Sequence, residues 1–353
     1  MSVTSEAVIE IPNPKEVLLF FMDHVRSEHD MEFETADDGS RYLELVPFRI
    51  ELLPEAAGLR VRLHGPSHDA LSFLKEDLVE HVSELDQEAA RNIRWSGEMA
   101  QVGELPPNFK LLTVTGTHVL SQNLQRVTLA HEEFSSLSQG GMHVRLMLPL
   151  LHGREPIWPR MAENGVPRWP QGEDKLHARF VTIRHIRAGE GEIDVDIVRH
   201  HGGLISDWSV ATTPGETVGM MGPAGVERLP SSGDVFLAAD ETGLPSVARL
   251  LETATTALTG HVVVAATDDL DLQTYVPKTN LQVERLLPES FRERVLDRAL
   301  DVTEPKVTCY GYFAGEFENA QELRAMFKSR LGLDKTAQLS VAYWREGVPG
   351  FGS

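Results

Sequence analysis

The hydrophobic pattern of the chain changes period twice, and this change constrains the fold more than any other feature. From about residue 232 onward, short apolar runs alternate with segments of helical spacing. "DVFLAADETG" is typical of a strand that runs into the helix "LPSVARLLETATTAL", and further strands are expected at "HVVVAATDD", "KVTCYGYFAGE" and "QLSVAYWREG". Strands that alternate with helices form a parallel sheet covered on both faces. The pattern therefore predicts an α/β parallel-sheet domain over residues 231–353.

The pattern between about residues 111 and 230 is all-β. Strands are expected at "LLTVTGTHVL", "LQRVTLAHEEF", "GMHVRLMLPLL", "RFVTIRHI", "GEIDVDIVRH" and "PGETVGMMGPAG", with a Pro- and Gly-containing stretch, 153–174, in between. Short strands separated by turns predict a closed antiparallel barrel. Pro106 and Pro107 break the chain before the first strand, so the barrel domain is assigned to residues 104–230.

The first 100 residues have the pattern of a separate small module. "NPKEVLLFFMDHVRSEH" begins with Asn13 as a helix cap and Pro14 at the first helical position. "RYLELVPFRIELL" and "GLRVRLHG" alternate as in a hairpin, and "PSHDALSFLKEDLVEHVSEL" returns to helical spacing. We therefore expect an α-β-β-α module over residues 1–103. The predicted fold class is an α+β module, an antiparallel β-barrel and an α/β parallel-sheet domain.

Composition excludes several classes of partner and site. The 53 Asp and Glu against 33 Lys and Arg give a net charge of −20, which argues against nucleic acid or an anionic membrane as a partner. One cysteine, Cys309, allows no internal disulfide and no multi-cysteine metal site, and its apolar run predicts burial. No resident metal is expected. With no leader-like N-terminus and no long apolar window, we expect a cytoplasmic protein without membrane insertion. Composition leaves the oligomeric state open.

Cations nevertheless gather between residues 175 and 208. This segment ends in Gly202 and Gly203 and contains Arg179, Arg184, Arg187, Arg199, His185, His200 and His201. An arginine fork binds phosphate well, glycines let the backbone approach a ligand, and Ser206 can start a helix whose amides face an anion. The segment thus favours an anionic cofactor, such as a flavin dinucleotide in the barrel, with a second dinucleotide at the edge of the sheet. Solvated surface arginines and a simple turn are the alternatives.

Seven motifs in the same order make residues 111–353 similar to a known family. They are "RFVTIR", Asp196 with His200, "GLISDW", "PGETVGMMGP", "ADETGLP", "AGE" at 314–316 and "YWR" at 343–345. In this order they resemble the siderophore-interacting protein family, FAD-dependent ferric-siderophore reductases of the ferredoxin-reductase type. Val181 stands where the family has tyrosine, and Ala239 where it has glycine. The N-terminal module resembles a domain of unknown function that is often fused to this family.

The resemblance implies a role for each matched residue, with positioning rather than acid–base catalysis as the protein's task. FAD would be held on the first strand by Arg179, Phe180, Val181, Thr182 and Arg184, and on its pyrophosphate and adenine side by His200, Gly203, Ser206 and Trp208. NAD(P) would lie against Asp240, Glu241, Thr242, Gly315 and Glu316, and Arg345 would contact an anionic ferric siderophore. Trp208 as core packing and Glu316 as a helix-start carboxylate are the alternatives. Val181 is expected to alter flavin affinity or redox tuning.

The implied function is reduction of a ferric siderophore, with electrons passing from NAD(P)H through FAD. Fe(II) is held less tightly than Fe(III) by hard oxygen ligands, so reduction releases the metal. Two alternatives remain: a general flavin or ferredoxin-type reductase without a siderophore role, and a non-enzymatic ferric-chelate-binding protein. Asp268, Asp269 and Asp271 follow the second strand of the α/β domain and disfavour a 2′-phosphate, so the sequence favours NADH over NADPH. Reduced ferredoxin as the electron donor stays open, as does the identity of the siderophore.

Overall fold

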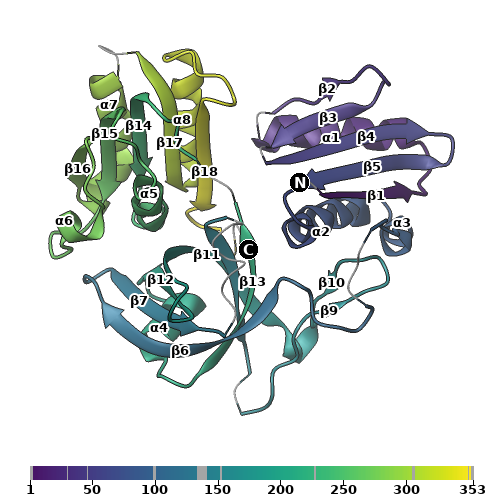
Figure 1. The fold of residues 1–353 in the computed structure, drawn as a ribbon, viewed down its shortest axis with the longest axis horizontal. Helices are drawn as coiled ribbons and strands as arrows, with labels where there is room; N and C mark the ends of the chain where they lie inside the picture. The colour runs from purple at the N-terminus through teal and green to yellow at the C-terminus, as the bar shows by residue number, and fades with distance from the viewer. Residues whose placement is uncertain are drawn as a thin grey trace. The chain divides into compact units, whose positions relative to one another are not determined.

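The structure is a computed structural model, and it describes residues 3–29, 31–45, 47–97, 101–132, 141–151, 153–225, 228–303, 307–348 and 350. The chain packs into two compact units, each of which is described by itself (Figure 1). Unit 1 contains Met1–Lys110, Pro149–His177 and Met221–Val226, and unit 2 contains Leu111–Leu148, Ala178–Met220 and Glu227–Ser353.

The N-terminal module of unit 1 is a five-stranded antiparallel sheet with helices packed against it. The strand order is β1-β5-β4-β3-β2, where the strands are β1 (Val3–Ile9), β2 (Glu34–Thr35), β3 (Arg41–Leu45), β4 (Phe48–Glu55) and β5 (Gly58–Gly65). The helices are α1 (Pro14–His29), α2 (His68–Leu85) and α3 (Gln87–Asn92). Leu52, Leu59 and Val61 of the sheet share a core with Phe21 of α1 and Leu71 of α2.

The predicted α-β-β-α pattern was right about the two long helices and wrong about the sheet. The run "RYLELVPFRIELL" contains two strands, β3 and β4, which pair antiparallel with Leu45 opposite Phe48. The N-terminal segment adds β1, which pairs along the whole of β5 and buries Ala7 and Ile9. The α+β class of the module is confirmed.

The long connection between barrel strands β8 (His143–Pro149) and β11 (Leu176–Arg187) packs on this module within unit 1. It carries β9 (Arg160–Met161), β10 (Pro167–Arg168) and the short 3₁₀ helix η2 (Gly172–Asp174). Val166 enters the core of the module, and Trp169 Nε1 donates to Glu76 Oε1 at 2.6 Å. The packing of this connection on the module was not predicted from the sequence. The domain limits at 103 and 230 stay predictions.

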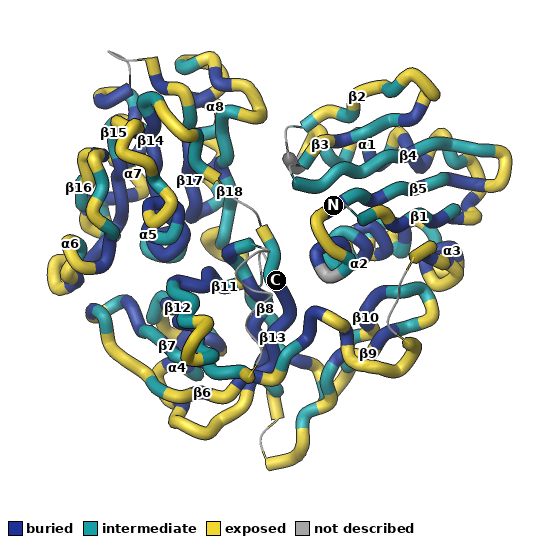
Figure 2. Tube along the Cα trace, in the orientation of Figure 1, coloured by how far each residue is buried: buried dark blue, intermediate teal, exposed yellow. Residues whose placement is uncertain are grey.

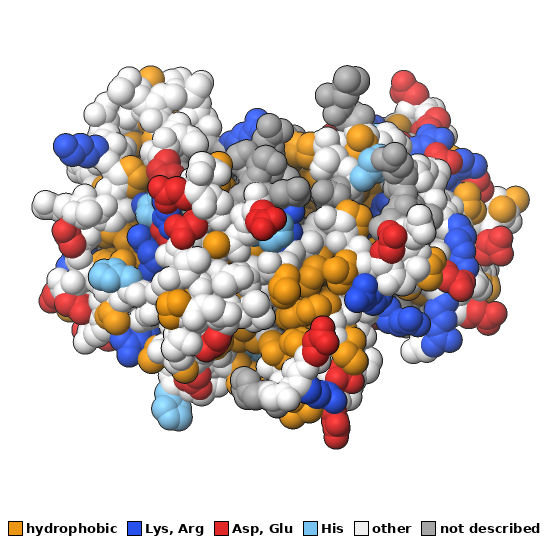
Figure 3. All heavy atoms as spheres, turned by 60° about the horizontal axis from the view of Figure 1, so that its bottom comes forward, with side chains coloured by type: hydrophobic (Ala, Val, Ile, Leu, Met, Phe, Trp, Pro, Cys, Tyr) orange, Lys and Arg blue, Asp and Glu red, His pale blue; other side chains and the backbone are white. Residues whose placement is uncertain are grey.

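The same connection exposes apolar side chains. Leu150, Leu151 and Ile157 are all exposed, and they line a shallow depression together with Arg154 and Asp174, which form an ion pair. Figure 3 shows hydrophobic side chains gathered on the face of the molecule that is turned forward there, among scattered charged ones. Among the described residues that line it, the one cation, Arg154, is already paired with Asp174, so the depression offers no free positive charge to a dinucleotide phosphate.

The predicted barrel is confirmed. Six strands close in the order β11-β12-β7-β6-β13-β8, and the four not yet located are β6 (Phe109–Val119), β7 (Leu124–Ala130), β12 (Glu192–Val198) and β13 (Thr217–Ala224). Alternate side chains such as Val127, Leu129, Ile193 and Val195 fill the interior. Helix α4 (Leu204–Ala211) connects β12 to β13 and adds Ile205 to this core.

The α/β domain of unit 2 is also confirmed. Its sheet is parallel, in the order β16-β15-β14-β17-β18, with β14 (Gly233–Ala239), β15 (Leu258–Ala265), β16 (Gln282–Leu286), β17 (Thr308–Glu316) and β18 (Gln338–Trp344). The helices are α5 (Leu244–Leu251), α6 (Leu272–Tyr275), α7 (Pro288–Thr303) and α8 (Phe317–Ser329). Val235 and Leu237 pack with α5, whereas Phe236 and Ala238 pack with α7 and α8. Figure 2 shows the resulting buried track along β14, β15 and β17.

Two expectations from composition can be compared with the structure. Cys309 was expected to be buried, and this is wrong, because side chains alternate along β17 and Thr308 takes the inward position while Cys309 is exposed. Within the described ranges, no helix is both long and apolar enough to cross a membrane.

Candidate functional site

Arg179 on β11 is a half-buried cation without an acidic partner. Its Nη1 donates to the carbonyl of Ala178 at 2.6 Å, and the part of the chain that the structure describes places no Asp or Glu within ion-pair distance of it. Burial lowers the pKa of Arg179, because removal from water disfavours the charged form. A desolvated, uncompensated arginine in a chain of net charge −20 is expected to bind an anion.

The other arginines of β11 have acidic partners. Arg187 pairs with Glu192 at 3.0 Å and with Asp194 at 2.6 Å. Arg184 is buried, forms an ion pair with Glu252 and donates from Nη2 to the carbonyl of Tyr275 at 2.7 Å. The structure therefore uses Arg184 to join the barrel to the α/β domain, and its predicted role at the cofactor has no support in this geometry.

The start of α4 forms a tight turn with open backbone donors. Gly203 is the N-cap residue of α4, and it has no side chain that could accept from the N–H groups of the first turn. A Cβ on Gly203 would lie 2.1 Å from Cε1 of His200, so any other residue would require that exposed ring to move. Ser206 Oγ is buried and accepts from the backbone N–H of His200 at 2.8 Å. His200, Gly203 and Ser206 are thus brought together, with first-turn amides that are free to face an anion.

The remaining predicted residues of the barrel have different surroundings. Phe180 is exposed beneath the guanidinium of Arg145, whose Cζ lies 4.8 Å from the ring centroid. Val181 and Trp208 pack against the barrel core, which supports the alternative interpretation of Trp208. Thr182 is buried, and its Oγ1 lies 3.3 Å from Nδ1 of His143.

Sequence reasoning missed the residues that connect Thr182 to the α/β domain. Nε2 of His143, on β8, lies 3.2 Å from the hydroxyl of Tyr343 on β18. A chain of polar contacts therefore runs from Thr182 through His143 to Tyr343, next to "YWR". The only available signal was a histidine at the start of an apolar strand, and that is a weak one.

Asp240 organises the junction between β14 and α5. Its Oδ1 accepts from the backbone N–H of Thr242 at 2.8 Å and of Gly243 at 3.2 Å, and Oδ2 accepts from Trp344 Nε1 at 2.7 Å. Burial raises the pKa of Asp240, although the hydrogen bonds from Thr242 and Trp344 oppose this shift. A Cβ on Gly315 would lie 2.6 Å from this carboxyl group, so β17 needs glycine here. Asp240 is therefore a positioning carboxylate.

The other acids at this edge of the sheet are also engaged. Asn123 Nδ2 donates to both carboxylate oxygens of Glu241, at 3.2 and 3.1 Å. Glu316 is buried, caps α8 by accepting from the N–H of Glu318 at 2.6 Å, and accepts from the N–H of Glu346 at 3.3 Å. This geometry supports the alternative interpretation of Glu316 as a helix-start carboxylate. Its placement near a nicotinamide stays a prediction.

Arg345 lies directly after β18 and is exposed. Its Cζ is 4.3 Å from the ring centroid of Phe317, at the start of α8. The guanidinium therefore stacks over an aromatic ring at the surface. Contact with a ferric siderophore stays a prediction for this residue.

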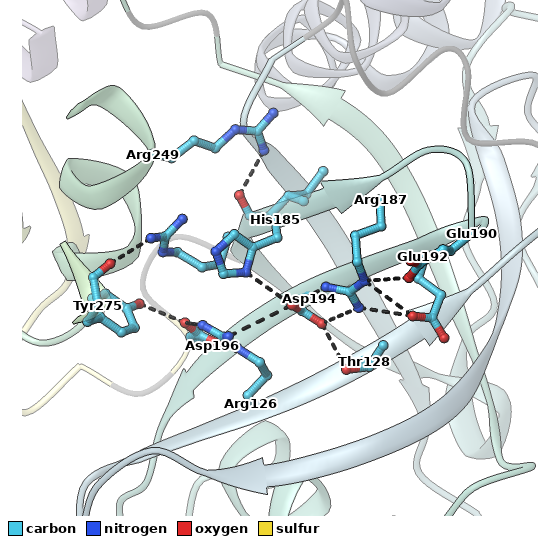
Figure 4. A network of polar contacts seen from close by, with 12 residues as sticks. Arg126, Thr128, His185, Arg187, Glu190, Glu192, Asp194, Asp196, Arg249 and Tyr275 are labelled. Carbon is cyan, nitrogen blue, oxygen red and sulfur yellow. Dashed lines mark hydrogen bonds and ion pairs between the residues drawn. The ribbon is translucent and has the colours of Figure 1, made fainter. Parts of the chain in front are cut away.

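A buried polar network joins the barrel to the α/β domain (Figure 4). Arg126 donates to both carboxylate oxygens of Asp196, at 2.7 and 2.8 Å, and the hydroxyl of Tyr275 donates to Asp196 at 2.7 Å. Next to this group, Asp194 accepts from Thr128 at 2.8 Å and from Arg187. Because Tyr275 belongs to α6, the network fixes the sheet of unit 2 against the barrel.

Comparison with known proteins identifies the family. Residues 113–227 match the siderophore-interacting FAD-binding domain, and residues 233–347 match the siderophore-interacting protein model. The chain belongs to the siderophore-interacting protein family. Its barrel is therefore the FAD-binding domain of that family, and residues 1–112 lie outside both matches.

Several named proteins are similar to this chain over the same region. Ferric vibriobactin reductase ViuB of Vibrio cholerae is 25% identical over 256 residues, which cover 67% of this chain and 90% of ViuB. The NADPH-dependent ferric-chelate reductase of Escherichia coli is 28% identical over 152 residues, which cover 41% of this chain and 57% of that enzyme. A siderophore utilization protein from T. fusca has a TM-score of 0.57 and 26% identity, and covers 72% of this chain and 97% of its own. SipS of Aeromonas hydrophila shares the fold, with a TM-score of 0.58 at 23% identity, over 68% of this chain and 93% of SipS.

The residues of the barrel fit FAD. The half-buried Arg179 without an acid supplies a fixed positive charge, and the Gly203 turn supplies backbone donors where a side chain would clash with His200. Both features are suited to a pyrophosphate.

Proposed function

We propose that this protein reduces ferric siderophores and releases Fe(II), with electrons that enter from NAD(P)H and pass through FAD. The observation that carries the proposal is Arg179, a desolvated cation with no acidic partner in the described residues, within a barrel that belongs to an FAD-binding family. The names of ViuB and of the Escherichia coli enzyme support ferric reduction. A cytoplasmic location, where NAD(P)H is held, is part of the proposal.

The chain contributes binding and orientation rather than acid–base catalysis. When bound, FAD accepts two electrons as a hydride and gives them up singly. Arg179 would neutralise its phosphates, and the amides at the start of α4 would bind the same anion. Asp240 holds Thr242 and Gly243 so that the start of α5 faces the carboxyl edge of the sheet, where a nicotinamide dinucleotide would lie. The network of Arg126, Asp196 and Tyr275 keeps these two sites at a constant separation.

The substrate side of the proposal rests on charge. Ferric siderophores are often anionic, so their approach to a chain of net charge −20 requires local cations. Arg345, exposed beside Phe317, is the proposed contact. We propose no catalytic residue and no resident metal, since iron is the substrate.

The test is a two-step stopped-flow experiment under anaerobic conditions. The purified, yellow protein is first bleached by NAD(P)H, and the reduced protein is then mixed with a ferric siderophore while a colorimetric chelator captures Fe(II). We expect flavin absorbance to return, with two Fe(II) formed per NAD(P)H consumed.

Each alternative function gives a different result. Reoxidation that is fast with ferredoxin or free flavin and slow with ferric chelates would favour a general flavin or ferredoxin-type reductase. A colourless protein that binds ferric chelates without reducing them would favour the non-enzymatic binding protein. Either outcome would overturn the proposal.

A further inference from the structure

The topology of the α/β domain places a dinucleotide at one position. From β14 the strand order runs outward through β15 to β16, and the chain then crosses to β17 and β18 on the other side of β14. In such sheets a ligand binds beyond the carboxyl ends of the strands, at the point where the order reverses, here β14 and β17. The pyrophosphate then faces the start of α5, and the residues that follow the neighbouring strand β15 face the adenosine ribose.

The loop after β15 presents one acid to that ribose. Three aspartates follow the strand, at 268, 269 and 271. Asp269 accepts from the backbone N–H of Gln122 at 2.7 Å, and Asp271 caps α6 by accepting from the N–H of Thr274 at 3.2 Å. The carboxylate of Asp268 lies 3.6 Å from Nη1 of Arg285, but the side chain is 84% exposed and this ion pair is screened by solvent, so Asp268 is the acid of the three that is open to a ligand.

The cation beside this loop is already engaged. Arg285 of β16 donates from Nη1 to the carbonyl of Asp268 at 3.1 Å and from Nη2 to the carbonyl of Leu270 at 2.6 Å. Its guanidinium also lies 3.6 Å from the Asp268 carboxylate. Arg285 thus shapes the loop and offsets one of its acids, so it is not available to bind a 2′-phosphate.

The surrounding edge of the sheet adds further negative charge. The acids Asp240, Glu289 and Asp269 lie near enough to Glu241 to interact with it electrostatically. A phosphate carrying between about one and a half and two charges is repelled by such a field, whereas a ribose hydroxyl is not.

We infer that the electron donor is NADH, and that Asp268 selects it by accepting hydrogen bonds from the ribose hydroxyls and repelling the 2′-phosphate of NADPH. The inference rests on the proposed function, because it refines the donor at the same site. It also sets this chain apart from its Escherichia coli relative, whose name specifies NADPH.

Calorimetric titration of the flavin-loaded protein with nucleotide fragments tests this choice without turnover. 5′-AMP and 2′,5′-ADP (adenosine 2′,5′-bisphosphate) differ only by the 2′-phosphate, and we expect 5′-AMP to bind at least about tenfold more tightly. Equal binding, or tighter binding of 2′,5′-ADP, would overturn the inference and leave ferric reduction by NAD(P)H intact. If neither fragment binds, the nucleotide site of the proposed function itself fails, and with it the inference.

Two variants and a matched control locate the effect. Asp268→Asn should reduce the preference for 5′-AMP by several-fold, whereas Asp301→Asn, which removes a 71% exposed acid from α7, should leave it unchanged. Arg285→Ala should weaken both fragments, because the loop loses its two carbonyl contacts, and it should weaken 2′,5′-ADP more, because Asp268 loses its counter-charge. A selective loss of 2′,5′-ADP that persists when Arg285→Ala is combined with Asp268→Asn would show that this arginine holds the phosphate, and it would refute the role given to Asp268.

Discussion

Replacement of Arg179 by alanine should separate flavin binding from folding. In the free protein, Arg179 is half-buried, burial lowers its pKa, and among the described residues its polar contact is with the Ala178 carbonyl. Removal of the side chain therefore relieves desolvation and deletes no ion pair, so the flavin-free protein should unfold at an equal or slightly higher temperature. The FAD complex loses a charge-assisted contact worth about 1.5–3 kcal/mol, so FAD should bind about 10- to 150-fold more weakly.

The assay combines flavin content, FAD affinity and thermal unfolding. Purified Arg179→Ala protein should show a reduced ratio of flavin to protein absorbance, and titration of the apoprotein with FAD should give the weaker affinity. Arg187→Ala is the control from the same strand, because that arginine is paired with Asp194 and Glu192. It should lower stability while folded molecules keep their affinity for FAD. Normal flavin content in Arg179→Ala would refute the assignment of this residue to the phosphate.

Three further predictions address stability. Tyr275→Phe should lower the free energy of unfolding by about 1.5–3 kcal/mol in denaturant titrations, because the hydroxyl that donates to the buried Asp196 is lost. Unchanged stability would show that Arg126 alone satisfies this carboxylate. Burial tends to raise the pKa of Asp194, but hydrogen bonds from His185, Arg187 and Thr128 override this effect and hold the pKa far below the ordinary value of 3.8. The stability that this group contributes should therefore be lost as the pH falls below 3.8, and Asp194→Asn should flatten the acid limb of the curve of stability against pH. Burial lowers the pKa of Lys75 from 10.5 to about 8, so the free energy of unfolding should rise as the pH increases from about 8 to 10.5. Lys75→Met should remove that rise and add up to about 3 kcal/mol to the free energy of unfolding at neutral pH. A pH profile of the variant identical to that of the wild type would contradict this.

Most of the architecture of unit 2 could be predicted from local pattern. The barrel strands are short runs separated by turns, and some, such as β7, alternate between buried and partly exposed side chains. Apolar runs such as "VFLAA" and "HVVVAA" are almost wholly buried, as a parallel strand covered on both faces requires. The N-terminal module was harder, because β1 is half polar and lies at the very start of the chain, where no turn signal precedes it. The packing of the connection 149–177 on the module could not be predicted, since it depends on contacts such as that of Val166 with residues far away in the sequence.

The candidate site was predicted unevenly, for a physical reason. Glycines and caps leave local signals, so Gly203, Ser206 and Asp240 were found where a helix begins. Side chains on strands carry no such signal. Arg179 and Arg184 look alike in sequence, but one is left without an acid while the other meets Glu252 and Tyr275, and only the three-dimensional arrangement separates them. The contact of His143 with Tyr343 joins residues 200 positions apart and was invisible for the same reason.

The pairing of its arginines explains how so acidic a chain can hold an anionic cofactor. Arg126, Arg184 and Arg187 are all compensated by carboxylates, so each contributes little net attraction to a ligand. Arg179 is not compensated, and its partial burial weakens screening by salt and water. Among the described arginines of β11, attraction for an anion is therefore concentrated at Arg179. The arrangement at the edge of the sheet is the reverse, because Asp240 and Glu241 are held by internal donors and the exposed Asp268 selects against added phosphate. One chain can thus bind the pyrophosphate of FAD firmly and still discriminate against a single extra phosphate on its electron donor.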